Sequence, residues 1–272
     1  MTNRSHSTYH ALQLSAQNNL NRFGLGFQAS YTWSKSIDDT SSVLGGFIAA
    51  SSGAVAQAWP QDPFHTSSDR GPSTFDITHA VTLSFVQELH AERVSFLRPL
   101  GKSLTEGWQI LSISTITSGP PFTIYSGVQQ TGVGSNGTDR PDQVGTPVLS
   151  TSRKIREDYF GLGDQNASFF SIPLNVSGGT GSNRGRFGAL GRNTFRGPAF
   201  HNFDFALIKD TRFGQRGSGE LATVQLRAEF FNLFNLTNFG LPANIVKGPG
   251  FGEISRTAGT SRQIQFSIKV IY

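Results

Sequence analysis

The sequence predicts an all-β fold, an antiparallel meander of about 7–10 strands that forms part of a transmembrane β-barrel with long outer loops. The first observation behind this prediction is the alternation of apolar and polar residues at the C-terminal end of the chain. Side chains of a strand point to opposite faces every two residues, so the apolar residues of this segment share one face. They are Ile264, Phe266, Ile268, Val270 and Tyr272. A soluble β-sandwich can end on such a strand, and an outer-membrane barrel typically does.

Six earlier segments supply the other expected strands; five of them alternate in a similar way, whereas 108–117 is β-rich and apolar on both faces. They cover approximately residues 8–17, 23–36, 75–89, 108–117, 200–209 and 221–231. Residues 122–126 are expected to resume the fourth strand after Pro120 and Pro121, which cannot donate to a ladder. The second segment ends its apolar face in Tyr31 and Trp33, where the aromatic girdle of a membrane barrel would lie.

The connections between these strands alternate in length along the chain. The shorter ones are residues 18–22, 90–106 and 211–219, and the longer ones are 37–74, 127–199 and 232–261. Outer-membrane barrels combine short periplasmic turns with long outer loops, whereas a soluble sandwich has no reason to sort its loops in this way. The alternation therefore favours the barrel. We expect a short helix at 47–58 and a hairpin within the second long loop.

The composition excludes several other classes of protein. Of the 272 residues, 36% are hydrophobic, and no segment approaches the run of roughly 18 apolar residues that a membrane helix requires. The chain has no cysteine, which excludes thiol catalysis, Cys-ligated zinc and disulfide scaffolds. A net charge of +5 would permit a polyanion partner, but the basic residues are scattered. We therefore expect a solvated basic surface and no nucleic-acid partner.

The sequence contains no complete catalytic, cofactor-binding or metal-binding motif. Gly101-Lys102-Ser103 resembles the end of a phosphate-binding loop, but Phe96 stands where that motif needs glycine. The six histidines form no ligand motif, and no acid/base pair has catalytic spacing. The acidic residues Asp38, Asp39, Asp62 and Asp69 could bind calcium in an outer loop, although solvated carboxylates are the more common case. We expect no enzymatic activity, no cofactor and no metal site.

The strand faces supply candidate residues for a membrane protein. In a barrel the polar face of the last two strands would meet the lumen or a plug, and in a soluble sheet it would meet solvent. Its residues are Gln225, Arg227, Glu229, Gln265 and Lys269, of which Lys269 could pair across the strands. The expected lipid face comprises Phe27, Tyr31, Trp33, Leu83, Phe85, Phe205, Leu226, Phe266 and Ile268, with Tyr272 at the periplasmic interface. Trp59, Phe64 and Tyr125 lie in long loops, where they could contact a ligand or pack locally.

Short motifs in a fixed order cover nearly the whole chain. They include Ser7-Thr8-Tyr9-His10-Ala11-Leu12-Gln13, Ala29-Ser30-Tyr31-Thr32-Trp33-Ser34-Lys35-Ser36-Ile37-Asp38-Asp39, Asp69-Arg70-Gly71-Pro72, Ser118-Gly119-Pro120-Pro121-Phe122-Thr123, Gly191-Arg192-Asn193-Thr194-Phe195-Arg196-Gly197-Pro198 and Arg227-Ala228-Glu229-Phe230-Phe231-Asn232-Leu233-Phe234-Asn235. Together they are similar to the C-terminal part of TonB-dependent outer-membrane receptors of Gram-negative bacteria, in particular the Oar-like branch.

This resemblance implies a barrel of about 22 strands, plugged by an N-terminal domain and energised by the TonB complex. The sequence shows no plug, no TonB-contacting segment and no signal peptide, and a strand count near seven would place Met1 outside the cell. We therefore expect residues 1–272 to be a C-terminal barrel segment that does not transport alone. Its expected partners are outer-membrane lipid or lipopolysaccharide, the remaining strands and plug, the TonB complex through the missing N-terminal part, and an unknown small ligand.

Two alternatives to the receptor segment stay open. The chain could be a self-contained small outer-membrane pore or adhesin, which would need an even number of strands and an export signal. It could also be a soluble β-rich module that binds carbohydrate or a polyanion.

Overall fold

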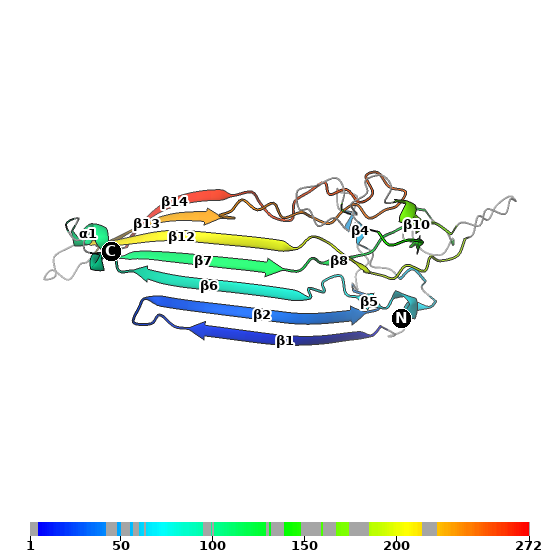
Figure 1. The fold of residues 1–272 in the computed structure, drawn as a ribbon, viewed down its shortest axis with the longest axis horizontal. Coiled ribbons are helices and arrows are strands. Elements are labelled where there is room, and N and C mark those ends of the chain that lie inside the picture. The colour runs from blue at the N-terminus through cyan, green and yellow to red at the C-terminus, as the bar shows by residue number, and fades with distance from the viewer. Residues whose placement is uncertain are drawn as a thin grey trace.

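The computed structural model describes residues 5–41, 48–49, 55–56, 60–62, 64–94, 99, 101–128, 131, 139–147, 159, 167–173, 185–213 and 222–271. Within these ranges, one antiparallel sheet contains seven long strands in the order β1-β2-β6-β7-β12-β13-β14, which is a meander (Figure 1). The strands are β1 (Ser7–Asn18), β2 (Leu25–Asp38), β6 (His79–Leu89), β7 (Trp108–Thr117), β12 (Phe200–Phe213), β13 (Ala222–Phe231) and β14 (Gln263–Ile271). The sheet is open, with β1 and β14 at its edges.

The register aligns the apolar residues of neighbouring strands on one face of the sheet, although β7 contributes Ser112 and Ser114 to that face. Phe27 lies opposite Phe85, Phe205 lies opposite Phe230, and Ala228 lies opposite Phe266, so apolar residues of neighbouring strands share a face. This apolar face is largely uncovered, since Phe266 is 77% exposed and Ile268 73% exposed. Soluble monomers rarely expose a continuous apolar surface of this kind, so the face requires an apolar environment.

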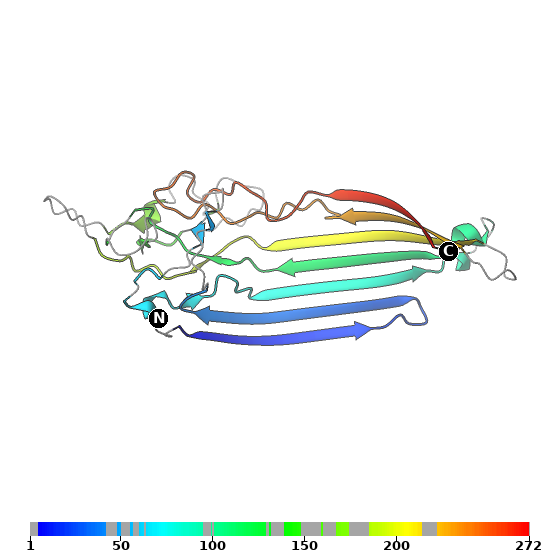
Figure 2. The same ribbon diagram turned by 180° about the vertical axis from the view of Figure 1, so that it is seen from behind.

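The two ends of the sheet differ, as the alternation of connection lengths predicts. The short connections and the helix α1 (Lys102–Thr105) lie at one end, and the long connections gather at the other (Figures 1 and 2). The chain begins at the end with the long connections and finishes at the other end. Among the described residues, no helix has the length and apolar character that crossing a bilayer requires.

Some predicted elements differ from the structure. The helix expected at 47–58 is wrong, because β3 (Ile48–Ala49) and β4 (Val55–Ala56) pair as antiparallel strands; the residues between them lie outside the described ranges. The fourth strand resumes only in part: after the interruption at 118–120, β8 (Pro121–Phe122) pairs with β11 (Phe195–Arg196) in the same register as β7 with β12. Residues 123–126, which were expected to continue this strand, lie outside it.

The second long loop contains the antiparallel pair that was expected there. Strand β9 (Asp142–Gln143) pairs with β10 (Phe170–Ser171), although the connection is long and does not form a tight hairpin. Strand β12 continues to Phe213, so it includes the first residues of the turn expected at 211–219.

The absence of cysteine allows the register to be tested with introduced pairs. We expect Gln225→Cys combined with Lys269→Cys to form a disulfide, because these two residues are directly opposed. Opposed residues of antiparallel strands have Cα atoms about 4.5–5.5 Å apart, which is within disulfide range. Non-reducing electrophoresis after mild oxidation measures the product. Gln225→Cys with Ile268→Cys is the matched control, because Ile268 lies on the other face; equal cross-linking of both pairs would show that the register is wrong.

Candidate functional site in the loop cap

The long connections fold together into one body at the end of the sheet, which we call the loop cap. It comprises the described residues of 60–78, 118–147, 159–199 and 232–262. Its apolar core consists of Phe122, Ile124, Tyr159, Phe170, Leu190, Phe195, Val246 and Ile254. Aromatic edges pack against faces there, with ring centroids 5.7 Å apart for Phe122 and Tyr159 and 5.6 Å apart for Phe170 and Phe251. None of these residues belongs to the seven long strands, so this apolar cluster is built by the loops.

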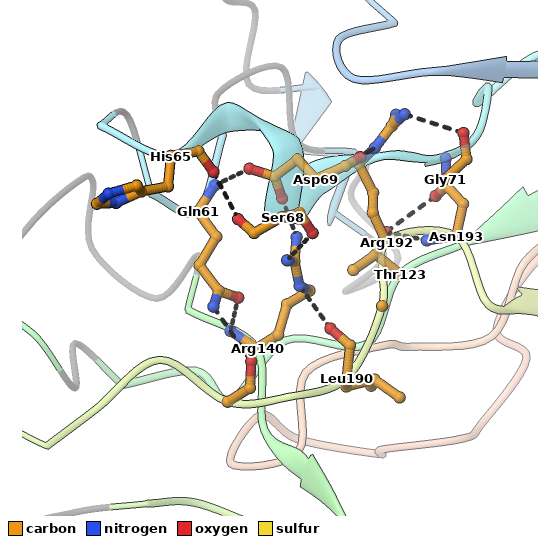
Figure 3. A network of polar contacts seen from close by, with 12 residues as sticks. Gln61, His65, Ser68, Asp69, Gly71, Thr123, Arg140, Leu190, Arg192 and Asn193 are labelled. Atoms are coloured by element: carbon orange, nitrogen blue, oxygen red, sulfur yellow. Dashed lines mark hydrogen bonds and ion pairs between the residues drawn. The ribbon is translucent and has the colours of Figure 1, made fainter.

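The first polar contact of the cap joins the first and second long loops (Figure 3). Arg140 donates to the carboxylate of Asp69, and these side chains are only 3% and 1% exposed, respectively. The Nε of Arg140 also donates to the carbonyl of Leu190 at 2.7 Å. Gln61 closes the network, because its backbone N–H donates to Asp69 at 2.8 Å and its side-chain oxygen accepts from the backbone N–H of Arg140 at 3.0 Å.

The second contact joins the cap to the end of strand β2. Arg192 donates to both the carboxylate and the backbone carbonyl of Asp38, and its Nε donates to the carbonyl of Asp69 at 2.7 Å. Its remaining nitrogen donates to Ser41 Oγ at 2.8 Å. The guanidinium thereby holds the end of β2 and the turn at Asp69 together. Gly71 permits this approach, because a Cβ at that position would lie 2.5 Å from the carbonyl oxygen of Arg192.

The third contact fixes the segment that leads into β6. Arg196 donates to the carboxylate and the backbone carbonyl of Asp76, and Asp76 also accepts from the backbone N–H of Ser36 at 2.6 Å. Asp76 is 2% exposed, whereas the side chain of Arg196 is 35% exposed. This pair therefore marks the border between the buried network and the solvent.

Side-chain amides link the loops that carry the three arginines. Asn193 adopts a left-handed conformation with φ of 54°, donates through its backbone N–H to Thr123 Oγ1 at 2.9 Å, and donates through Nδ2 to the carbonyl of Pro72 at 2.7 Å. Asn244, which is 1% exposed, donates to the carbonyl of Thr123 at 2.6 Å. Segments far apart in the sequence are thus held by satisfied hydrogen bonds in the interior of the cap.

The arrangement compensates buried charges and connects distant loop segments. Asp38, Asp69 and Asp76 are each engaged by an arginine and by a further donor, so their charges are compensated in the interior. Within the described ranges, no group of three or more His, Asp or Glu side chains could hold a metal ion. At the margin of the cap, Arg186 donates to Asp142 at 3.0 Å and holds the pKa of that carboxyl below its usual range.

The structure corrects two expectations about charged residues. Asp38, Asp39 and Asp69 are not solvated loop carboxylates, since they are 3%, 8% and 1% exposed. The basic residues do not all form a solvated surface either, because Arg140 and Arg192 are 2% and 7% exposed. For Asp38 and Asp69 the reason is pairing with Arg192 and Arg140 across the first two long loops, whereas Asp39 accepts from the backbone N–H of His6.

The aromatic loop candidates lie in different environments. Tyr125 is 2% exposed and belongs to a parallel bridge with Ile245, so it packs locally and is not presented to a ligand. Phe64 is 77% exposed. Trp59 and Tyr272 lie outside the described residues.

The polar-face and apolar-face candidates lie where the alternation places them. Gln225 lies opposite Lys269 and Glu229 lies opposite Gln265, on the same face as Arg227. Apart from Tyr272, the candidates for the apolar face all lie on the opposite face. They are Phe27, Tyr31, Trp33, Leu83, Phe85, Phe205, Leu226, Phe266 and Ile268. The hydroxyl of Tyr31 lies 2.9 Å from His79 Nδ1, which gives this face a polar contact near the loop cap. That one face meets lipid and the other the lumen stays a prediction.

The sequence reasoning missed Arg140, Arg192 and Arg196 as the residues that organise the cap. Two of them occur beside glycine, in Gly191-Arg192 and Arg196-Gly197. A charged residue next to a glycine that allows close backbone approach was the available signal. The segments 69–72 and 191–198, which carried the family resemblance, are the segments that meet at this network.

An antiparallel meander with an uncovered apolar face, a polar opposite face and long loops gathered at one end defines an outer-membrane β-barrel protein. The comparison with known families agrees: the model of the outer membrane beta barrel domain matches residues 1–265. The chain belongs to this family, and its location is the outer membrane. No curated protein and no solved structure matches it significantly.

The network predicts that replacing a buried arginine destabilises the loop cap far more than replacing an exposed one. We expect Arg192→Met to destabilise the loop cap by about 3–5 kcal/mol, because Asp38 is then left buried without its partner. Arg186→Met is the control and should cost far less, because its side chain is 64% exposed and its ion pair is screened by solvent. Hydrogen exchange of the amides at 188–198 measures the opening of the cap. Similar protection in both variants would contradict a structural role for the buried pair.

Proposed function

We propose that this chain is the C-terminal barrel segment of a TonB-dependent receptor, a non-enzymatic protein whose loop cap belongs to the outer, ligand-collecting surface. The direction of the edge strands carries the proposal. In an antiparallel meander of seven strands, β1 and β14 run in the same direction. A barrel closed by antiparallel pairing therefore needs an odd number of additional strands between them, in keeping with the even totals of single-chain bacterial barrels.

The alternative of a self-contained pore is less consistent with this geometry. Direct pairing of β1 with β14 would create one parallel ladder in a sheet whose long-strand ladders are all antiparallel among the described residues. The loop cap further supports the receptor, because the motifs that resemble this receptor class lie together in it. On this proposal the missing partners are the remaining strands and plug, with the TonB complex acting through the plug side of the full protein.

The proposal predicts the size of the native protein. An antibody against residues 185–213 should detect, in native outer membranes, a polypeptide much larger than the 29.4 kDa of this chain. The additional mass is expected because the remaining strands and plug belong to the same receptor. A membrane-inserted species of 29.4 kDa as the sole product would contradict the receptor proposal.

The assignment of the faces is tested by two adjacent substitutions in β14. We expect Phe266→Lys to destabilise the protein folded in lipid vesicles by about 2–4 kcal/mol, because a lysine near the bilayer midplane must leave water. Ser267→Lys should cost far less, because Ser267 lies on the polar face opposite Arg227. Denaturant titration in vesicles measures both values. Equal effects would refute the assignment of the faces.

A further inference from the structure

A cavity of about 510 Å³ lies where the loop cap meets the sheet. Its wall on the sheet side includes Ile77 before β6, Thr117 at the end of β7 and Phe200 at the start of β12. The wall on the cap side includes Phe239 and Leu241. The volume lies within the range of about 300–1,000 Å³ that small-molecule sites occupy, and the lining is mostly apolar, as is usual for such sites.

The cap side of this cavity is held in place by hydrogen bonds and packing. Phe239 and Leu241 also pack against the apolar core of the cap. Just before them, Asn238 is 5% exposed; its Oδ1 accepts from the backbone N–H of His201 at 2.8 Å, and its Nδ2 donates to the carbonyl of His201 at 2.9 Å. This clamp ties the third long loop to β12. The cavity wall is therefore preorganised, which lowers the cost of ordering it around a ligand.

A short antiparallel contact brings one arginine to this wall. Phe239 forms a bridge with Thr257, and the backbone N–H of Gly240 donates to the carbonyl of Arg256 at 2.9 Å. Gly240 leaves room for the arginine, because a Cβ there would lie 3.0 Å from its Cγ and 3.4 Å from its Nε. Arg256 thus lines the cavity at a position fixed by the backbone.

Arg256 differs from the arginines of the buried network. Arg140, Arg192 and Arg196 each engage a carboxylate, whereas among the described residues no ion pair involves Arg256. The residues that line the cavity include no aspartate or glutamate. An apolar cavity with one available guanidinium is complementary to a molecule that has an apolar body and one anionic group, and arginine binds carboxylates through two parallel hydrogen bonds.

We propose that this cavity binds a small soluble amphipathic anion, with its apolar body against Phe200, Phe239 and Leu241 and its carboxylate or equivalent group on Arg256. This proposal names a ligand class for the proposed receptor. That the receptor collects this ligand rests on the proposed function. Binding itself depends only on the cavity and its arginine.

Fluorine NMR with 6-fluoro-2-naphthoate as the probe tests the proposal. Outer-membrane vesicles that contain the complete gene product should broaden the probe signal more than vesicles that lack it. The neutral 6-fluoro-2-naphthamide should bind at least tenfold more weakly, because it cannot form the charged contact. Arg256→Gln should weaken naphthoate binding about tenfold or more and leave naphthamide binding unchanged.

Two further variants separate a specific site from a change in folding. Arg262→Gln alters another exposed arginine of the same loop, outside the cavity lining, and should leave binding unchanged. Ala258→Trp fills the cavity from an exposed position and should abolish binding of both probes. Unchanged binding in Arg256→Gln, or equal binding of naphthoate and naphthamide, would overturn the proposal.

The binding measurement and the size of the native protein test the ligand class and the receptor assignment separately. Specific naphthoate binding by a protein of only 29.4 kDa would refute the receptor assignment and support the cavity. A larger protein in the outer membrane without naphthoate binding would support the receptor assignment and refute the ligand class.

Discussion

The two-residue period of the strand is the constraint on which the rest of this structure depends. Because most of the long strands place their apolar residues on one face and their polar residues on the other, pairing of the strands produces a sheet with two unlike surfaces. In a membrane the apolar surface is matched by lipid, and the backbone groups are satisfied by the ladders. The sheet therefore needs no protein layer packed against its apolar face.

Because the sheet has no such layer, the tightly packed apolar cluster of the described chain lies in its loops. The cap buries an apolar cluster and three Asp–Arg pairs, features that soluble proteins place between their regular elements. Buried ion pairs contribute little net stability, because desolvation offsets their attraction, but removal of one partner is costly. Their effect here is to specify one arrangement of long loops. A surface that holds a small ligand benefits from such an arrangement, since less order has to be created on binding.

The fold was predictable from the sequence where a local rule governs it, and the cap was not. The alternation around Phe27 and Phe266 located strands because it reflects a backbone period, and the sorting of connection lengths gave the polarity of the meander. By contrast, the partners of Asp38 and Asp69 lie in other loops, and no periodicity connects them. The prediction that these carboxylates are solvated was wrong for that reason. Tyr125 was a ligand candidate because its loop is long, yet burial within the cap is a tertiary property that loop length does not encode.

The contact between Arg192 and Asp38 joins residues that are 154 positions apart in the chain. Closure of so large a loop is entropically unfavourable until the intervening strands are in place, so this contact belongs to the late stages of folding. It is also sensitive to the order of the sheet, because a slip of one residue in β2 would turn Asp38 to the opposite face, away from the guanidinium. We therefore expect the loop cap to become rigid only after the strands beneath it have paired in the correct register.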